Sequence, residues 1–242
     1  MSSSPVHYFV TGTDTEVGKT LVACAVMVGL QRIWPQRRVS GFKPVVAGTY
    51  LDAMDRRVNE DLLSLVSAAN LRQSLDDICP YILDTPAAPH LVAKDISLEM
   101  RIPKIMETLE GVLMQTDQVV MEGAGGFLVP LNEEESLADL AQRLKWPVIV
   151  VVGMRLGCLS HALLTLEAIR SRGLRVAGWV ANTMDPQMSH LRENLADLQM
   201  RIPEPFLGQI PHLPDSLKKA DQSPYTQEAV NWAASHLNLD LL

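Results

Sequence analysis

Short apolar runs alternate along the chain with longer segments in which apolar residues recur at the spacing of a helix. The apolar runs predict strands at residues 7–11, 39–43, 118–123, 147–153, 176–182 and 205–211. The segments of helical period predict helices at residues 19–32, 60–69, 98–115, 137–144, 160–172, 189–200 and 226–236. Strands separated by helices favour parallel pairing with right-handed crossovers, so we expect one doubly wound parallel α/β domain over residues 1–242.

The strand predicted at 147–153 supports this topology because every position in it is apolar. Such a strand is expected where helices cover both faces of a parallel sheet. In open sheets of this kind the ligand lies beyond the carboxyl ends of the strands. The residues that directly follow each predicted strand are therefore the first candidates for a functional site.

Composition narrows the partners and the compartment. Hydrophobic residues make up 47% and charged residues 20%, as in ordinary globular proteins. The 28 acidic residues outnumber the 21 basic ones, and the net charge of −7 argues against a general attraction to nucleic acid or to an anionic membrane. The three cysteines form no C-x-x-C pair, which indicates a reducing compartment. The N-terminus lacks the pattern of a secretory leader, and no apolar run could span a bilayer, so we expect a cytoplasmic protein.

The first strand–helix junction has the pattern of a phosphate loop. Gly12 follows the strand and Gly18 precedes the helix, whose free N–H groups and positive dipole end favour an anion. In this pattern Lys19 reaches the terminal phosphates and the Thr20 hydroxyl can bind Mg²⁺. The consensus has a glycine six residues before the lysine, whereas this chain has Thr13 there, followed by further hydroxyls and acids.

Other predicted strand and helix ends carry charged residues. Glu122 ends a strand and is followed by glycines, so its carboxylate is a candidate Mg²⁺ ligand. Lys43 ends the second strand, and Pro44 is expected to stop regular structure there; although most lysines are surface charges, this position favours stabilisation of a transferring phosphoryl group. Asp61 opens a helix, where the pattern alone favours a cap or a partner of the helix dipole.

The residues alone leave two sites open. Residues 157–160 begin a helix with free N–H groups, which fits either a second anion site or a plain helix start capped by Ser160. Asn182 ends a strand, and its amide can either pair with the edge of adenine or form a turn.

Taken together, these segments resemble those of the dethiobiotin synthetases, the ATP-dependent carboxylases that close the ureido ring in biotin synthesis. The segments that match are FVTGTDTEVGKT, GFKPV, VVMEGAGG, PVIVVVGMRLGC, GWVAN and LGQIP, in the order of the family. The first is close to diagnostic, because the hydroxyl-and-acid insert before GKT is this family's form of the loop. The resemblance implies a P-loop NTPase fold, ATP as co-substrate, Mg²⁺ as cofactor and a homodimer.

The resemblance also implies roles for individual residues. Lys43 and Lys19 would be catalytic, and Thr20, Asp61 and Glu122 would surround Mg²⁺. The residues implied in ATP binding are Glu16, Val17, Gly18, Lys19, Thr20, Leu21, Asp61, Glu122, Gly123, Ala124, Gly125, Asn182, Thr183, Pro211, His212 and Leu213. The residues implied in substrate binding are Thr15, Lys43, Ala47, Gly157, Cys158 and Leu159, the last three serving the site of the neighbouring subunit.

The implied reaction carboxylates 7,8-diaminononanoate with CO₂ and closes the ring to dethiobiotin, with release of ADP and phosphate. Two positions depart from the family pattern. Ala47 stands where a serine is usual, with Thr49 as the nearest hydroxyl, and His212 stands where a tryptophan is the commoner choice.

Two other kinds of protein share a similar loop. The cobyrinate and cobyric acid amidating synthetases also carry a glutamine-hydrolysing domain, for which this chain is too short. Partition-type ATPases are nucleotide switches that usually show a lysine early in the loop and a basic or amphipathic surface element. Here position 13 is threonine and the net charge is acidic, and both observations argue against a partition-type switch. The switch and the amidating synthetases remain the alternatives to the dethiobiotin synthetases.

Overall fold

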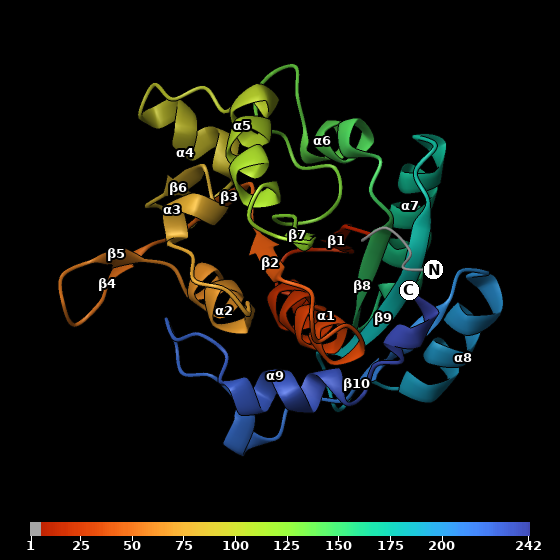
Figure 1. The fold of residues 1–242 in the computed structure, drawn as a ribbon. Coiled ribbons are helices and arrows are strands. Elements are labelled where there is room, and N and C mark those ends of the chain that lie inside the picture. The colour runs from red at the N-terminus through yellow and green to blue at the C-terminus, as the bar shows by residue number, and fades with distance from the viewer. Residues whose placement is uncertain (1–5) are drawn as a thin grey trace.

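The computed structural model describes residues 6–242, which form a central six-stranded sheet (Figure 1). The strands are β1 (Tyr8–Gly12), β2 (Val39–Phe42), β7 (Gln118–Glu122), β8 (Val148–Met154), β9 (Val176–Thr183) and β10 (Phe206–Ile210). They lie in the order β10-β9-β8-β1-β7-β2, and each neighbouring pair is parallel. The predicted parallel sheet is confirmed. Residues 1–5, part of the N-terminus that is expected to be no secretory leader, lie outside the described part.

Helices cover both faces of the sheet, as a doubly wound fold requires. The predicted helices are present as α1 (Lys19–Ile33), α2 (Glu60–Ala68), α5 (Ile102–Leu113), α6 (Leu137–Leu144), α7 (Cys158–Ser171), α8 (Leu191–Arg201) and α9 (Gln227–Ala234). Figure 1 shows α1, α2 and α9 on one side of the sheet and α5, α6 and α7 on the other. Every residue of β8 is buried, which explains its continuous apolar sequence.

The order of the strands fixes where a ligand can bind. Within the sheet, β2 and β7 lie on one side of β1, and the strands after β7, beginning with β8, lie on the other side of β1. This reversal is a topological switch point, where the ligand crevice lies outside the carboxyl ends of the strands. Val10 of β1 is in register with Glu122 at the end of β7, so the fold brings the predicted phosphate loop and this acid to the same crevice.

The segment between β2 and α5 contains structure that the hydrophobic pattern did not predict. Its elements are β3 (Val45–Ala47), β4 (Tyr50–Leu51), β5 (Arg57–Val58), α3 (Leu75–Ile78), β6 (Tyr81–Leu83) and α4 (Pro89–Asp95), besides the predicted α2. β2 ends at Phe42, and Lys43 and Pro44 belong to no strand, as expected for Pro44, but a new strand, β3, begins directly after it and pairs in parallel with β6. The four missed strands have two or three residues and the two missed helices four and seven, which is too short for the period of a strand or a helix to show in the sequence.

Four helices begin at other residues than predicted, and α8 (residue 191 instead of 189) and α9 (227 instead of 226) differ least. α5 begins at Ile102 instead of residue 98, because Pro103 lies in its first turn, where proline is tolerated. α7 begins at Cys158, and its N-cap is Gly157 with φ +95°. Ser160 therefore lies inside α7, and the interpretation of Ser160 as the helix cap is wrong.

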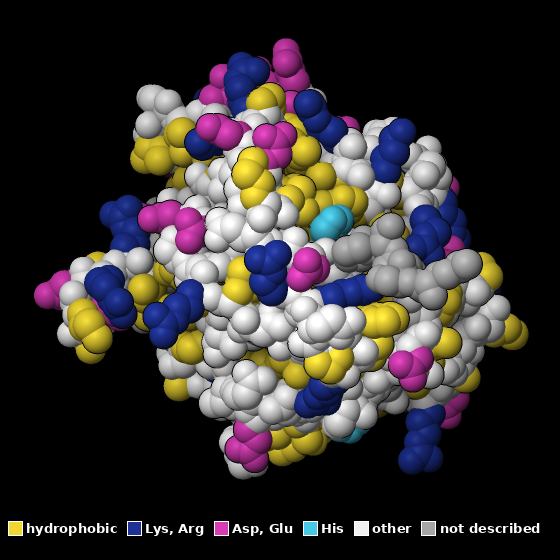
Figure 2. All heavy atoms as spheres, in the orientation of Figure 1, with side chains coloured by type: hydrophobic (Ala, Val, Ile, Leu, Met, Phe, Trp, Pro, Cys, Tyr) yellow, Lys and Arg dark blue, Asp and Glu magenta, His cyan; other side chains and the backbone are white. Residues whose placement is uncertain are grey.

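The surface carries charges of both signs. On the face shown in Figure 2, Lys and Arg side chains are interspersed with Asp and Glu side chains. Within residues 6–242, no helix has the length and the apolar character needed to cross a membrane. All three cysteines are free and buried.

Candidate active site

Glycines allow the loop between β1 and α1 to close tightly. Gly18 has φ +83°, and a Cβ there would lie 2.2 Å from the Asn182 side-chain nitrogen. A Cβ at Gly12 would lie 2.6 Å from a methyl group of Val17. Thr13, at the position where the consensus has glycine, continues the strand instead, because its N–H donates to the Val151 carbonyl at 2.9 Å. The shifted glycine thus fits a loop whose first residue still pairs with β8.

Asn182 holds this loop from the end of β9. Its Nδ2 donates to the Val17 carbonyl at 2.9 Å and to the Met184 sulfur at 3.2 Å. These two contacts take up both amide hydrogens, so only the carbonyl oxygen of the side chain is left to accept a hydrogen bond from a ligand. The sequence pattern predicted that Asn182 either pairs with adenine or forms a turn. It did not predict the hydrogen bond of Asn182 to the phosphate loop.

Lys19 lies beneath the loop in a largely buried position. Its Nζ donates to the Asp14 carbonyl at 2.8 Å. Burial lowers the pKa of Lys19 to about 8, against the opposing attraction of Glu122. An anion in the loop would stabilise the charged form of Lys19, because opposite charges favour ionisation.

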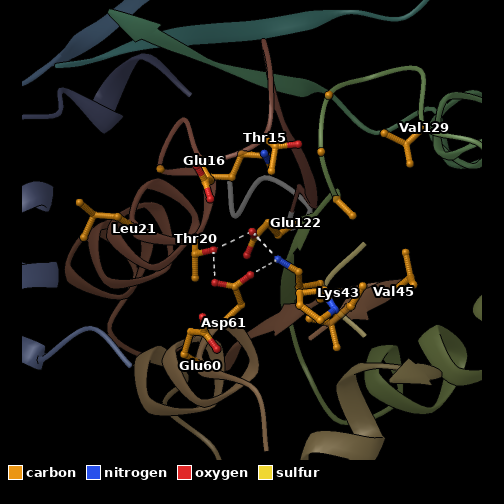
Figure 3. Close-up of a pocket in the computed structure, with 18 of the residues that line it drawn as sticks. Thr15, Glu16, Thr20, Leu21, Lys43, Val45, Glu60, Asp61, Glu122 and Val129 are labelled. Atoms are coloured by element: carbon orange, nitrogen blue, oxygen red, sulfur yellow. Dashed lines mark hydrogen bonds and ion pairs between the residues drawn. The ribbon is translucent and has the colours of Figure 1, made fainter. Parts of the chain in front are cut away.

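Four polar side chains from four segments meet at the floor of the crevice (Figure 3). The Lys43 ammonium donates to Asp61 Oδ2 and to Glu122 Oε1, each at 2.7 Å. The Thr20 hydroxyl lies 2.8 Å from Asp61 Oδ1 and 2.8 Å from Glu122 Oε1. We call Thr20, Lys43, Asp61 and Glu122 the polar cluster.

The polar cluster is short of positive charge. Burial alone would lower the pKa of Lys43, but Asp61 and Glu122 outweigh it and raise this pKa. Burial raises the pKa of Glu122 despite the attraction of Lys43. Glu122 Oε2 is buried without a hydrogen-bond partner among residues 6–242, and the single proton of Thr20 faces two carboxylate oxygens. An additional cation would satisfy these oxygens, which are hard ligands of the type Mg²⁺ prefers.

Asp61 belongs to this cluster and does not cap its helix. The N-cap of α2 is Asn59, whose side chain accepts from the N–H groups of Asp61 and Leu62. The Asp61 carboxylate is thereby free to face Thr20 and Lys43. Burial raises the pKa of Asp61, but Lys43 lowers it more, so this carboxylate is ionised. Of the two roles that the pattern favoured, the helix cap is wrong, whereas Asp61 does lie in the first turn of α2, where an acid faces the positive end of the helix dipole.

The polar cluster opens into a cleft with a volume of about 920 Å³. The predicted site residues that line it are Thr15, Glu16, Gly18, Lys19, Thr20, Leu21, Lys43, Ala47, Asp61, Glu122, Ala124, Gly125, Asn182, Thr183, His212 and Leu213. Further lining residues, which the sequence did not single out for the site, include Val45, Val46, Glu60, Pro86, His90, Val129, Met184, Lys218, Lys219 and Tyr225. Of the remaining predicted residues, Val17, Gly123 and Pro211 adjoin lining residues but are not among them.

The wall beside Lys43 is apolar at the position of the missing serine. Ala47 faces the cleft together with Val45, Val46 and Pro86. Thr49 does not replace the hydroxyl, because its Oγ1 donates to Asp84 Oδ1 at 2.6 Å and Thr49 is not part of the lining. His90 supplies a polar group in this wall, with its Nδ1 buried and unpartnered among the described residues.

Residues 157–159 lie outside the cleft that holds the other predicted residues. Cys158 is buried at the start of α7, while the preceding Leu156 is 93% exposed. Arg155, just before this turn, forms an ion pair with Asp14 of the phosphate loop. The predicted second anion site is therefore linked to the phosphate loop through the Arg155–Asp14 ion pair, but its residues do not line the cleft of their own subunit.

Comparison with known proteins shows the family. A family model described as an AAA domain matches residues 7–220. The ATP-dependent dethiobiotin synthetase of Aromatoleum aromaticum is 47% identical over 211 residues, which cover 87% of this chain and 92% of that protein. The synthetase of Ralstonia nicotianae is also 47% identical, over 87% of this chain and 91% of its own length. That of Pseudomonas aeruginosa is 42% identical, over 88% and 92%.

Solved structures support the fold class. A ParA family ATPase from Chlorobium tepidum has a TM-score of 0.55 at 16% identity, covering 96% of this chain and 91% of that one. The MinD cell division protein of Aquifex aeolicus has a TM-score of 0.53 at 12% identity, covering 94% and 87%. At these identities the likeness concerns the fold alone. The expected P-loop NTPase fold is confirmed.

Gly18 provides a direct test of the loop geometry. We expect Gly18→Ala to weaken ATP binding at least about tenfold, because it strains a left-handed residue and displaces Asn182. Gly111→Ala in α5 is a matched control, since its Cβ would meet no atom within 4 Å. Calorimetric titration of both purified variants measures the difference. Equal ATP affinity in the two variants would contradict this view of the loop.

Proposed function

The chain belongs to the family of ATP-dependent dethiobiotin synthetases, and on this premise we propose that its cleft binds ATP and 7,8-diaminononanoate and closes the ureido ring of dethiobiotin. The observation that carries this proposal is the buried Lys43 ammonium, held by Asp61 and Glu122 beside the start of the phosphate loop helix. This arrangement suits the stabilisation of a phosphoryl group during transfer.

The reaction consists of three steps. One amine of the substrate adds to CO₂ and loses a proton, which gives a carbamate. A carbamate oxygen attacks the γ-phosphorus of ATP, the bond to the bridging oxygen breaks, and ADP leaves. The second amine attacks the carbamoyl carbon, phosphate leaves with the carbon–oxygen electron pair, and the nitrogen loses a proton as the ring closes. The protein positions the reactants and stabilises charge, without a covalent intermediate.

Lys43 and Lys19 take the two catalytic roles in this scheme. Lys43 is buried with its ammonium fixed by two hydrogen bonds, so its charge is preorganised at the floor of the cleft. Lys19 is bonded only to the Asp14 carbonyl, which a phosphate oxygen can replace as a stronger, charged acceptor.

The polar cluster also fits a magnesium ion. Thr20, Asp61 and Glu122 would hold it, which is supported by the unpartnered Glu122 Oε2 and by the shortage of cations around two carboxylates. Mg²⁺ bound there would neutralise charge on the phosphates of ATP. Within residues 6–242 no group of three His, Cys, Asp or Glu side chains could hold a metal, so the hydroxyl and the ATP phosphates are needed to complete this site.

Glu122→Gln tests the metal site. The amide keeps the shape of the side chain but removes one negative charge, so we expect the Mg²⁺ concentration for half-maximal activity to rise about tenfold or more, the size of a lost charge-assisted contact. Activity is measured in a magnesium titration at saturating ATP. An unchanged titration curve would remove Glu122 from the metal site.

Lys43→Ala tests the catalytic lysine. We expect kcat to fall by about 10²–10³, the usual loss when one preorganised stabiliser is removed. The assay is run with Mg²⁺ present, because the variant leaves the buried Glu122 and the partly exposed Asp61 without their cation and is expected to melt at lower temperature when Mg²⁺ is absent. A folded variant with wild-type kcat would refute the role of Lys43.

We place the carboxylate of the substrate at residues 157–159 of a partner subunit in a homodimer. These residues lie outside the cleft of their own chain, and exposed Leu156 and Leu164 flank them with apolar surface. The start of α7 favours a carboxylate through its helix dipole and the N–H groups of its first turn, except that of Cys158, which already donates to the Arg155 carbonyl at 3.0 Å. The free, buried cysteines are consistent with a reaction in the reducing cytoplasm.

Mixed dimers test this placement. Lys43→Ala and Gly157→Pro chains are each expected to be inactive alone, the second because proline cannot adopt φ +95°. In a mixed two-fold dimer, one of the two sites combines both unaltered parts, so activity is expected to return in about half of its sites. Differently tagged chains confirm the subunit exchange. Proven mixed dimers without activity would mean that the turn serves its own subunit.

A further inference from the structure

The segment between β10 and α9 contributes residues to the cleft that the dethiobiotin synthetase motifs do not include. Lys218, Lys219 and Tyr225 of this segment line the cleft. The Tyr225 N–H donates to Ser64 Oγ at 3.0 Å. Because Ser64 belongs to α2, this bond ties the segment to the helix that carries Asp61.

The Lys219 side chain lines the cleft, and the N–H groups of its ammonium donate no hydrogen bond to the described residues. Its side chain is 25% exposed, and its Nζ lies 5.7 Å from the centre of the Tyr225 ring. The nearest carboxylate oxygen, Glu60 Oε1, is 3.7 Å away, which is an ion pair but too long for a hydrogen bond. Among the described residues no hydrogen bond has Lys219 Nζ as its donor. All three N–H groups are thus available to a ligand oxygen.

The charges along the cleft show why such a donor matters. The lining contains the acids Glu16, Glu60, Asp61 and Glu122 and the lysines Lys19, Lys43, Lys218 and Lys219. Without the last two lysines, the lining would present two net negative charges to a polyphosphate. Lys43 is committed to its two carboxylates, and the half-exposed Lys218 is paired with Asp215 at 2.7 Å. Lys219 is therefore the best placed cation of this segment.

We propose that Lys219 is a nucleotide-positioning residue, which exchanges Glu60 for a phosphate oxygen of ATP when the nucleotide binds. The contact with Glu60 is weak enough to be replaced, because a phosphate offers a charged acceptor at hydrogen-bond distance. The ring of Tyr225, 5.7 Å from the Lys219 ammonium, attracts this cation and so favours its position at the cleft. This inference rests on the proposed binding of ATP in the same cleft.

The test compares four variants by ATP titration and by steady-state kinetics. Lys219→Met keeps an apolar stem over Tyr225 but removes the charge, and it is expected to raise the Kd and KM for ATP about tenfold with kcat nearly unchanged. Lys219→Arg is expected to restore most of the affinity. Lys218→Met is the matched control on the neighbouring residue, with an expected change below about twofold. Lys19→Met reports on the phosphate loop itself.

The outcomes separate the two hypotheses. Weaker ATP binding in Lys219→Met, rescued by arginine and absent from Lys218→Met, supports the role of Lys219. If Lys19→Met loses affinity while Lys219→Met binds like the wild type, the inference about Lys219 is wrong and the ATP site stands. If neither variant loses affinity, the proposed ATP site itself is wrong. A melting temperature unchanged from the wild type confirms that each variant is folded.

Discussion

The buried ion pairs of Lys43 with Asp61 and Glu122 are the constraint on which the rest of the site depends. A buried ammonium, a buried carboxylate and a second, partly exposed carboxylate are tolerated here only if they are held in mutual contact. Their segments are the end of β2, the start of α2 and the end of β7, and Thr20 joins them to α1. Displacement of β2 or β7 would leave a buried charge unpaired. The charges that hold these segments together are those that we propose to act in phosphoryl transfer.

Separate contacts hold the phosphate loop in place next to the polar cluster. Asn182 at the end of β9 bonds to Val17, and Gly18 leaves just enough room for its amide. Asp14 accepts from Lys19 through its carbonyl and pairs with Arg155 through its carboxylate. The hydroxyl-and-acid insert therefore connects the nucleotide end of the crevice to the turn that begins α7.

The sequence predicted the parts of the fold that have a long, regular pattern. The strand β8 and the helix α1 follow from apolar runs and helical spacing, and Glu122 and Lys43 follow from the rule that ligands lie at strand ends. Asp61 was misjudged because its helix is capped by Asn59, two residues earlier, and only tertiary packing turns the carboxylate to the cluster. β3, β6 and α4 are too short to detect. Lys219 and Tyr225 come from a segment of low periodicity, so nothing in the pattern placed them at the cleft.

The central claim is that ATP is cleaved here in the service of ring closure, and the ATP turnover of the purified protein tests it most directly. ADP release is measured with Mg²⁺ and bicarbonate, with and without 7,8-diaminononanoate, while dethiobiotin is quantified in the same samples. We expect little ADP without the diamine, and one dethiobiotin for each ADP in its presence. ATP hydrolysis at the same rate with and without the diamine, and no dethiobiotin, would contradict the claim and would indicate a nucleotide switch.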